Sequence, residues 1–133
     1  MTKIHMALAA FSMIALTGCE TTGGVATSHI SHSVTAEERA LVHATLSSKL
    51  KARGLQIEKL QATEHLDSGM ITICGYVTGI TPAGTRSKPA VFGGTITANQ
   101  KSAFTLLGGG GSGQDASRSH AVKTICQANE IYI

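Results

Sequence analysis

The chain has 133 residues, with 11 lysines and arginines against 8 aspartates and glutamates, so its formal net charge is +3 at pH 7. This charge is too small to argue for nucleic-acid binding, because the basic residues are scattered along the sequence. Aromatic residues make up 4% of the chain and tryptophan is absent, which leaves few rings on which bases or sugars could stack. The length suits one small domain with a hydrophobic core.

The chain starts with a short basic segment and a brief apolar run. Lys3 precedes mostly apolar residues from 4 to 16, a pattern typical of a secretory signal peptide and too short for a permanent membrane span. The run ends in residues 16–19, LTGC, which resemble the lipobox of bacterial lipoproteins. The resemblance implies diacylglycerol on the Cys19 sulfur, cleavage that removes residues 1–18, and acylation of the new amino terminus.

Two or three acyl chains would hold the protein at a membrane, whereas one chain anchors only marginally. Glu20 follows Cys19, and in well-studied enteric bacteria an aspartate at this place favours retention at the inner membrane. The sequence therefore predicts a lipid-anchored protein of the cell envelope, at the outer membrane rather than the inner one.

Residues 19–34 are predicted to form a lipidated, flexible tether, because Thr, Ser, Gly and His dominate them and little can be buried. His29 and His32 lie in this stretch. Two histidines do not complete a metal site, so we expect both to be solvated linker residues.

The folded domain is predicted to cover residues 35–133 and to begin with a helix. Thr35 and Glu38 fit a capping box, in which each side chain bonds the backbone amide of the other residue. Apolar residues then recur at four-residue spacing and predict one packed stripe, at Val42, Leu46 and Leu50. Gly54 is expected to end the helix in the left-handed conformation.

Beyond the helix the periodicity becomes that of strands. Alternating apolar residues from 55 to 62 predict a strand with a bulge near Lys59 and Leu60. Residues 70–80 are rich in β-branched side chains and apolar on both faces, which predicts a strand inside a sheet. Two further strands are expected over residues 90–98 and 102–107.

Residues 108–113, GGGGSG, contain G-x-G-x-x-G. Too little chain follows for a dinucleotide-binding βαβ unit, so we expect a flexible surface loop. Asp115 is predicted to cap a second helix over residues 116–128, and residues 130–133 to add an edge strand or pack on the sheet. The predicted fold is α+β, with an N-terminal helix, a small antiparallel sheet of about four strands and a C-terminal helix.

Once Cys19 carries lipid, Cys74 and Cys126 remain as an even pair in an exported protein, which predicts one disulfide between the sheet and the C-terminal helix. The alternative is a reactive thiol pair, although neither cysteine belongs to a C-x-x-C motif or adjoins a His or Lys.

Residues 74–77, CGYV, and 92–94, FGG, carry a second resemblance. They are similar to Cys-Gly-x-Val-Asn and Phe-Gly-Gly-Tyr motifs in a group of small exported proteobacterial proteins of unknown role. Thr78 and Thr95 stand where that group has Asn and Tyr. The resemblance implies a compact domain with Cys74 near Cys126.

No complete catalytic set is visible in the sequence. The domain contains His43, His65 and His120 but no G-x-S-x-G elbow or S-x-x-K pattern, so we predict no catalytic residue, metal ion or cofactor. The leading hypothesis is a non-catalytic binding or structural role with an envelope protein or cell-wall partner, without nucleic acid. The alternative is a periplasmic inhibitor of a hydrolase such as lysozyme, which would present residues 81–89 or 108–113.

Overall fold

The computed structural model of the protein describes residues 28–111 and 116–133. The predicted signal peptide, Cys19, the first part of the predicted tether and Asp115 lie outside the described residues. The elements in chain order are β1 (His29–His32), α1 (Ala36–Leu50), β2 (Arg53–His65), β3 (Ile71–Ile80), β4 (Ala90–Ile96), β5 (Thr105–Gly109) and α2 (Ala116–Ala128).

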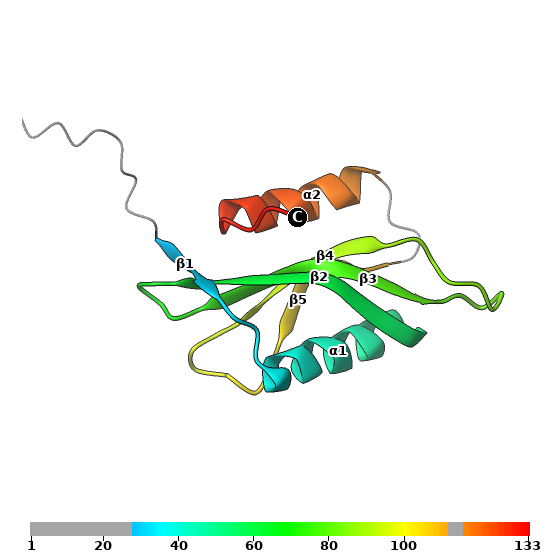
Figure 1. The fold of residues 1–133 in the computed structure, drawn as a ribbon, viewed down its shortest axis with the longest axis horizontal. Coiled ribbons are helices and arrows are strands. Elements are labelled where there is room, and N and C mark those ends of the chain that lie inside the picture. Colours follow the sequence, from blue (N-terminus) through cyan, green and yellow to red (C-terminus); the bar gives the residue numbers. More distant parts are fainter. Residues whose placement is uncertain (1–27, 112–115) are drawn as a thin grey trace, which may run out of the picture.

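The strands form one five-stranded antiparallel sheet in the order β1-β2-β3-β4-β5. Helix α1 connects β1 to β2 and covers one face of the sheet, while α2 covers the opposite face (Figure 1). The predicted α+β class is therefore confirmed, with five strands in place of about four. All described elements lie within residues 28–133, so a fragment that begins at residue 20 contains all of these elements.

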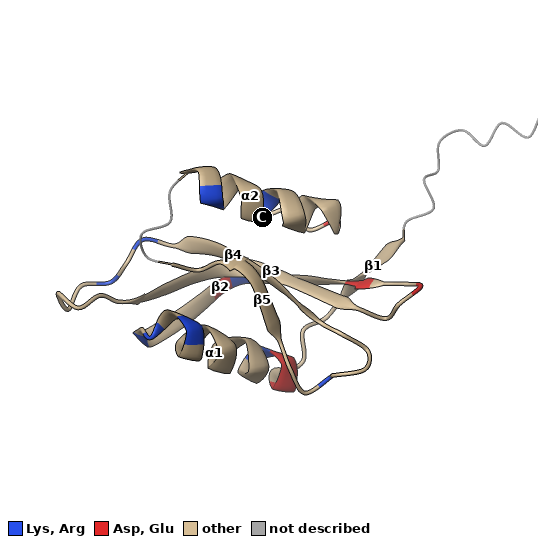
Figure 2. Ribbon diagram, turned by 180° about the vertical axis from the view of Figure 1, so that it is seen from behind, with Lys and Arg blue, Asp and Glu red and all other residues tan. Residues whose placement is uncertain are grey.

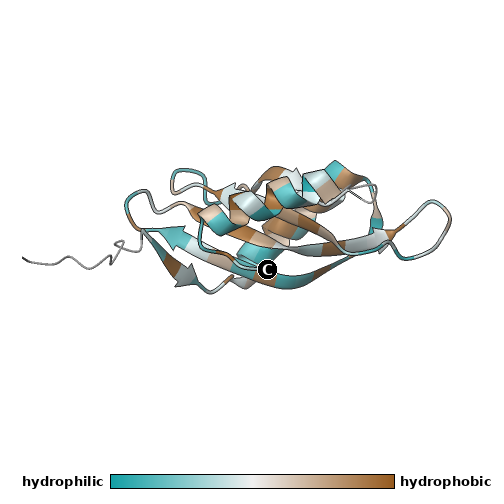
Figure 3. Cartoon of the chain, turned by 90° about the horizontal axis from the view of Figure 1, so that it is seen from above, coloured by the Kyte–Doolittle hydropathy of each residue, from teal (hydrophilic) through white to brown (hydrophobic). Residues whose placement is uncertain are grey.

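Successive side chains of the central strands point to opposite faces of the sheet, and each face carries its own hydrophobic core. Ile73 and Val77 of β3 face α1 and pack with Val42 and Leu46. Cys74, which follows Ile73, faces α2. The second core lies there and also contains Val91, Val122, Cys126 and Ile131. Figure 3, viewed from the α2 side, shows hydrophobic and hydrophilic residues interspersed along this helix, as expected for one that packs on a sheet by one face.

The start of α1 follows the sequence prediction. The Glu38 amide donates to the Thr35 hydroxyl at 3.1 Å, and the Thr35 amide donates to the Glu38 carboxylate at 2.9 Å, which confirms the capping box. The predicted end is wrong, because Lys51 rather than Gly54 takes the left-handed conformation at the helix end, with φ 50°. Gly54, at φ 60°, instead lies in an irregular stretch of β2.

The predicted bulge in β2 is confirmed. Lys59 has a φ of 51°, and the pairing register between β2 and β3 shifts between Glu58 and Gln61. The extra residue bends the strand, which increases its twist over the α1 face.

Folded structure begins earlier than predicted, because part of the expected tether is strand β1. His29–His32 pair antiparallel with residues 62–65 of β2. The side chains of His29 and His32 are only 9% and 19% exposed, so the expectation of solvated linker histidines is wrong. Sequence periodicity could not reveal this strand, since its partner lies 30 residues away and its contacts are polar.

The glycine-rich segment is also more ordered than predicted as far as it is described. Gly108 and Gly109 end β5, and the Gly110 amide donates to the Val91 carbonyl at 2.9 Å. A Cβ atom on Gly109 would collide with the Val91 carbonyl oxygen, and its φ is 84°. Glycine is thus required for a close approach of two backbones, and the flexible-loop prediction is wrong for Gly108–Gly110. Residues 112 and 113 lie outside the described ranges.

Residues after α2 pack on the sheet without forming a strand, which is one of the two expected outcomes. Ile131 is 2% exposed in the core of the α2 face.

Candidate functional site

Cys74 and Cys126 form the predicted disulfide between β3 and α2, with Cα atoms 6.2 Å apart. Both residues are fully buried. A joined, buried pair offers no thiolate to a substrate, so the alternative of a reactive thiol pair is not supported. These two residues stabilise the domain rather than form a reaction centre.

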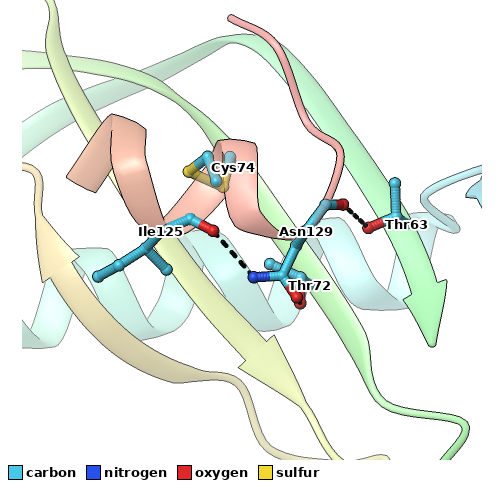
Figure 4. The surroundings of a disulfide bond; sticks show 6 residues. Thr63, Thr72, Cys74, Ile125 and Asn129 are labelled. Atoms are coloured by element: carbon cyan, nitrogen blue, oxygen red, sulfur yellow. Dashed lines mark hydrogen bonds between the residues drawn. A yellow bond between two sulfur atoms is a disulfide. The ribbon is translucent and has the colours of Figure 1, made fainter. Parts of the chain in front are cut away.

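A polar network that the sequence did not reveal lies next to the disulfide (Figure 4). The Asn129 side chain accepts from the Thr72 hydroxyl at 3.2 Å and donates to the Ile125 carbonyl at 2.8 Å, and its backbone carbonyl accepts from the Thr63 hydroxyl at 2.7 Å. Thr63 and Thr72 are themselves buried. The network therefore fixes the end of α2 to β2 and β3 and satisfies polar groups that burial would otherwise penalise.

The histidines singled out by the sequence do not come together. His43 is exposed on α1 and His120 is exposed on α2, and these helices lie on opposite faces of the sheet (Figure 1). Nδ1 of His65 accepts from the amides of Asp67 and Ser68 at 3.3 and 3.4 Å, so this ring stabilises the turn after β2. Within residues 28–111 and 116–133, no group of three or more His, Cys, Asp or Glu side chains could hold a metal ion.

A cluster of histidines and carboxylates surrounds β1 instead. Nε2 of His32 lies 2.9 Å from the Glu38 carboxylate, and its Nδ1 lies 3.7 Å from Glu64. The rings of His29 and His65 meet edge to face with centroids 4.8 Å apart. These contacts hold the strand against the domain, which gives the cluster a structural role.

Basic side chains lie together at one end of the domain. Figure 2 shows Lys and Arg at the end of α1 and in the β3–β4 loop, and acidic residues at the start of α1 and at the β2–β3 turn. We define the basic end as Lys49, Lys51, Arg53 and Arg86, all exposed. Nη1 of Arg86 donates to the Gly54 carbonyl at 3.2 Å, which places its guanidinium beside the start of β2. Three of these residues lie within five positions of the sequence, and the fold adds Arg86 to them.

A cavity of about 660 Å³ opens between the end of α1, the start of β2 and the end of β3. Lys49, Lys51 and Arg53 line it together with the apolar side chains of Leu50, Leu55 and Val77 and the backbone of Gly110 and Gly111. Its volume lies within the roughly 300–1,000 Å³ typical of small-molecule sites. An apolar floor beside a cationic rim suits a ligand that carries negative charge.

Electrostatics make this cavity attractive to anions. Among the described residues, no carboxylate lies within 4.0 Å of the side-chain nitrogens of Lys49, Lys51 or Arg53. The C-terminal end of α1 contributes a partial negative charge of only about half an elementary charge, which does not neutralise three cations. Arg53 also lies beyond the helix, so the helix dipole does not account for its position. A bound anion would relieve the repulsion between these like charges.

The polar side chains that line the cavity are cations and hydroxyls. The polar ones besides the cations are Thr78, Thr81 and Ser87. The Ser87 hydroxyl accepts from the Gly79 amide at 3.0 Å, and the Thr78 hydroxyl accepts from Arg86 at 3.0 Å. None of the described lining residues is a His, Cys, Asp or Glu, so no hydroxyl here has a partnered general base of the kind that activates a nucleophile.

Comparison with protein-family models, curated proteins and solved structures found no match to this chain. In the part of the chain that the structure describes, no helix has the length and apolar character needed to cross a membrane.

Proposed function

We propose that this protein is a lipid-anchored envelope lipoprotein whose domain is a non-catalytic binding module for an anionic ligand of the envelope. The observation that carries this proposal is the cavity of about 660 Å³ rimmed by Lys49, Lys51 and Arg53. The lipobox-like residues 16–19 support the location, and the absence of an acid–base pair among the described cavity residues supports the binding role.

The position of β1 fits a lipid-anchored domain with an accessible cavity. The strand begins at the end of the domain remote from the β3–β4 loop and the end of α1 (Figure 1). The chain therefore enters the described domain at a point remote from the cationic cavity.

The test is a nuclear magnetic resonance titration of the fragment 20–133 with methyl phosphate. We expect amide resonances of residues 49–53 and 110–111 to shift and saturate, because these backbones line the cavity. Reversal of charge in the triple variant K49E/K51E/R53E should abolish the shifts. The matched control Lys101→Glu, in the exposed turn before β5, should retain them. Shifts spread over all lysines alike, or unchanged in the triple variant, would refute the proposal.

A second candidate function is inhibition of a hydrolase, which the hydrogen bonds within the β3–β4 loop favour. The Thr81 amide donates to the Thr85 carbonyl at 2.8 Å and the Gly84 amide to the Thr81 carbonyl at 2.9 Å, so an exposed loop tip is held in one conformation. Inhibitors that present a pre-organised loop lose little entropy on binding. Arg86 and Lys88 in this loop count against a basic target such as lysozyme. Inhibition of lysozyme by the fragment 20–133 would establish this alternative.

A further inference from the structure

A second cavity adjoins the cationic one. It has a volume of about 440 Å³ and lies between β5 and α2. Leu50 and Gly111 line both cavities, so the two are neighbours on either side of these residues. A Cβ atom on Gly111 would meet none of the described atoms within 4 Å.

The second cavity is mainly apolar. Ala121, Val122 and Ile125 line it from one face of α2, and Leu107 lines it from β5. Leu107 is 51% exposed, so a large apolar side chain already faces this space. Arg118 is its one charged lining residue among those described, and it lies in the first turn of α2. The combined groove therefore has three cations at one end, and mainly apolar side chains together with Arg118 along the rest.

We infer that this groove binds a single anionic amphiphile, with its charged head at Lys49, Lys51 and Arg53 and one alkyl chain between β5 and α2. The inference rests on the proposed function and adds the chemical class of the ligand. Charge complementarity selects the head, and a cavity lined by Leu107, Val122 and Ile125 selects an aliphatic chain. Both volumes lie within the range of roughly 300–1,000 Å³ found for small-molecule sites.

An added peptide strand fits this groove less well. In β5, Leu106 and Gly108 pair with consecutive residues of β4, which leaves Leu107 as an extra residue in a bulge. A bulge interrupts the regular row of backbone donors and acceptors that a further strand needs. An alkyl chain has no such requirement, since it presents no hydrogen-bonding groups.

The experiment compares butyl, octyl and dodecyl phosphate below their micelle-forming concentrations on the fragment 20–133, with resonance shifts as the measure of binding. One buried methylene strengthens binding by up to about fourfold, and in a partly open groove we expect about tenfold for each four added carbons. The longer chains should shift resonances of Leu107, Ala121 and Ile125, whereas methyl phosphate should not.

Two variants of α2 provide a matched pair. Ala121→Phe would fill the groove from an exposed position, so it should remove the advantage of dodecyl over butyl phosphate. Ala128→Phe, also exposed on α2 but outside the groove, should retain that advantage.

Equal affinity for butyl and dodecyl phosphate at the cationic rim would overturn the inference and leave the proposed function standing. Loss of all phosphate binding at the rim would overturn both. Dodecyl maltoside binding as tightly as dodecyl phosphate would overturn the role of the charged head, and preferential binding of an apolar peptide along β5 would replace the amphiphile.

Discussion

A Cβ atom on Gly93 would lie 3.2 Å from the Sγ atom of Cys126, so the bare backbone of β4 provides the space in which the disulfide lies. Gly94, the next residue, serves the other face, where a Cβ atom would collide with the ring of Phe104. Phe104 is 5% exposed in the core of the α1 face. The two adjacent glycines therefore allow close packing on both sides of one strand.

Gly93→Ala should destabilise the domain. The added methyl group would press on both sulfur atoms, at 3.2 and 3.3 Å, and overpacking of this kind costs about 1–3 kcal/mol. Urea unfolding followed by circular dichroism measures the change in the free energy of unfolding. Gly111→Ala is the control, because its Cβ atom would meet nothing within 4 Å. Equal stability of the two variants would contradict this account of Gly93.

Asn129→Ala should also destabilise the domain, by about 1–3 kcal/mol, because it leaves the buried Thr72 hydroxyl and the Ile125 carbonyl without their partner. Chemical denaturation measures the change. Asn99→Ala, at an exposed turn, is the control, because it removes an asparagine side chain without touching the network. An unchanged unfolding midpoint in Asn129→Ala would show that the network contributes nothing.

Stability should fall in acid through Glu38. Partial burial raises the pKa of this carboxyl, but hydrogen bonds from the Thr35 amide and from His32, together with the charge of His32, outweigh burial and lower the pKa below its usual value of 4.5. Because the folded-state pKa is the lower one, the stabilisation is present above about pH 4.5 and is lost as the pH falls through the folded-state value.

The variant Glu38→Gln removes this ionisation. Unfolding free energies measured across the acidic range should therefore fall less steeply with decreasing pH in Glu38→Gln than in the unchanged protein. Glu37→Gln, in the same helical turn, is the control and should keep the original slope. Parallel curves for the Glu38 variant and the unchanged protein would rule out this contribution.

Cys19 should be the site of lipid attachment. Metabolic labelling with an alkyne analogue of palmitate should label the full chain in a bacterial host, and Cys19→Ser should abolish the label. Cys74→Ser serves as the matched control, since it removes a cysteine without touching residues 16–19, and it should remain labelled. Label that persists in Cys19→Ser would remove the basis for a lipoprotein.

Local signals in the sequence predicted much of the fold. Thr35 and Glu38 are three residues apart and predict the start of α1 by themselves, and the β-branched run of residues 70–80 predicts β3 in the same way. The Cys74–Cys126 bond was predicted by counting the cysteines of an exported chain. Its sequence separation of 52 corresponds to a stabilisation of about 4 kcal/mol in the chain-entropy treatment of disulfides.

Features that depend on distant parts of the chain could not be predicted. Strand β1 has no apolar alternation. His29 is shielded by contacts with His65 and Glu130, and His32 by contacts with Glu38 and Glu64, all of them distant in the sequence or in other elements. The position of Arg86 at the basic end has the same origin, because this residue reaches Gly54 across 32 positions of sequence. The other three members are neighbours in the sequence. Local sequence patterns likewise do not reveal the two cavities, because Leu50 comes close to Gly110 only through the packing of α1 on the sheet.

The central claim is that the cationic cavity binds an anion. Calorimetric titration of octyl phosphate into the fragment 20–133 and into K49E/K51E/R53E tests it most directly, with circular dichroism to confirm that both are folded. We predict saturable binding to the unchanged fragment that weakens as salt is added, and at least tenfold weaker binding to the triple variant. Equal affinity of the two proteins, or no binding to either, would contradict the claim.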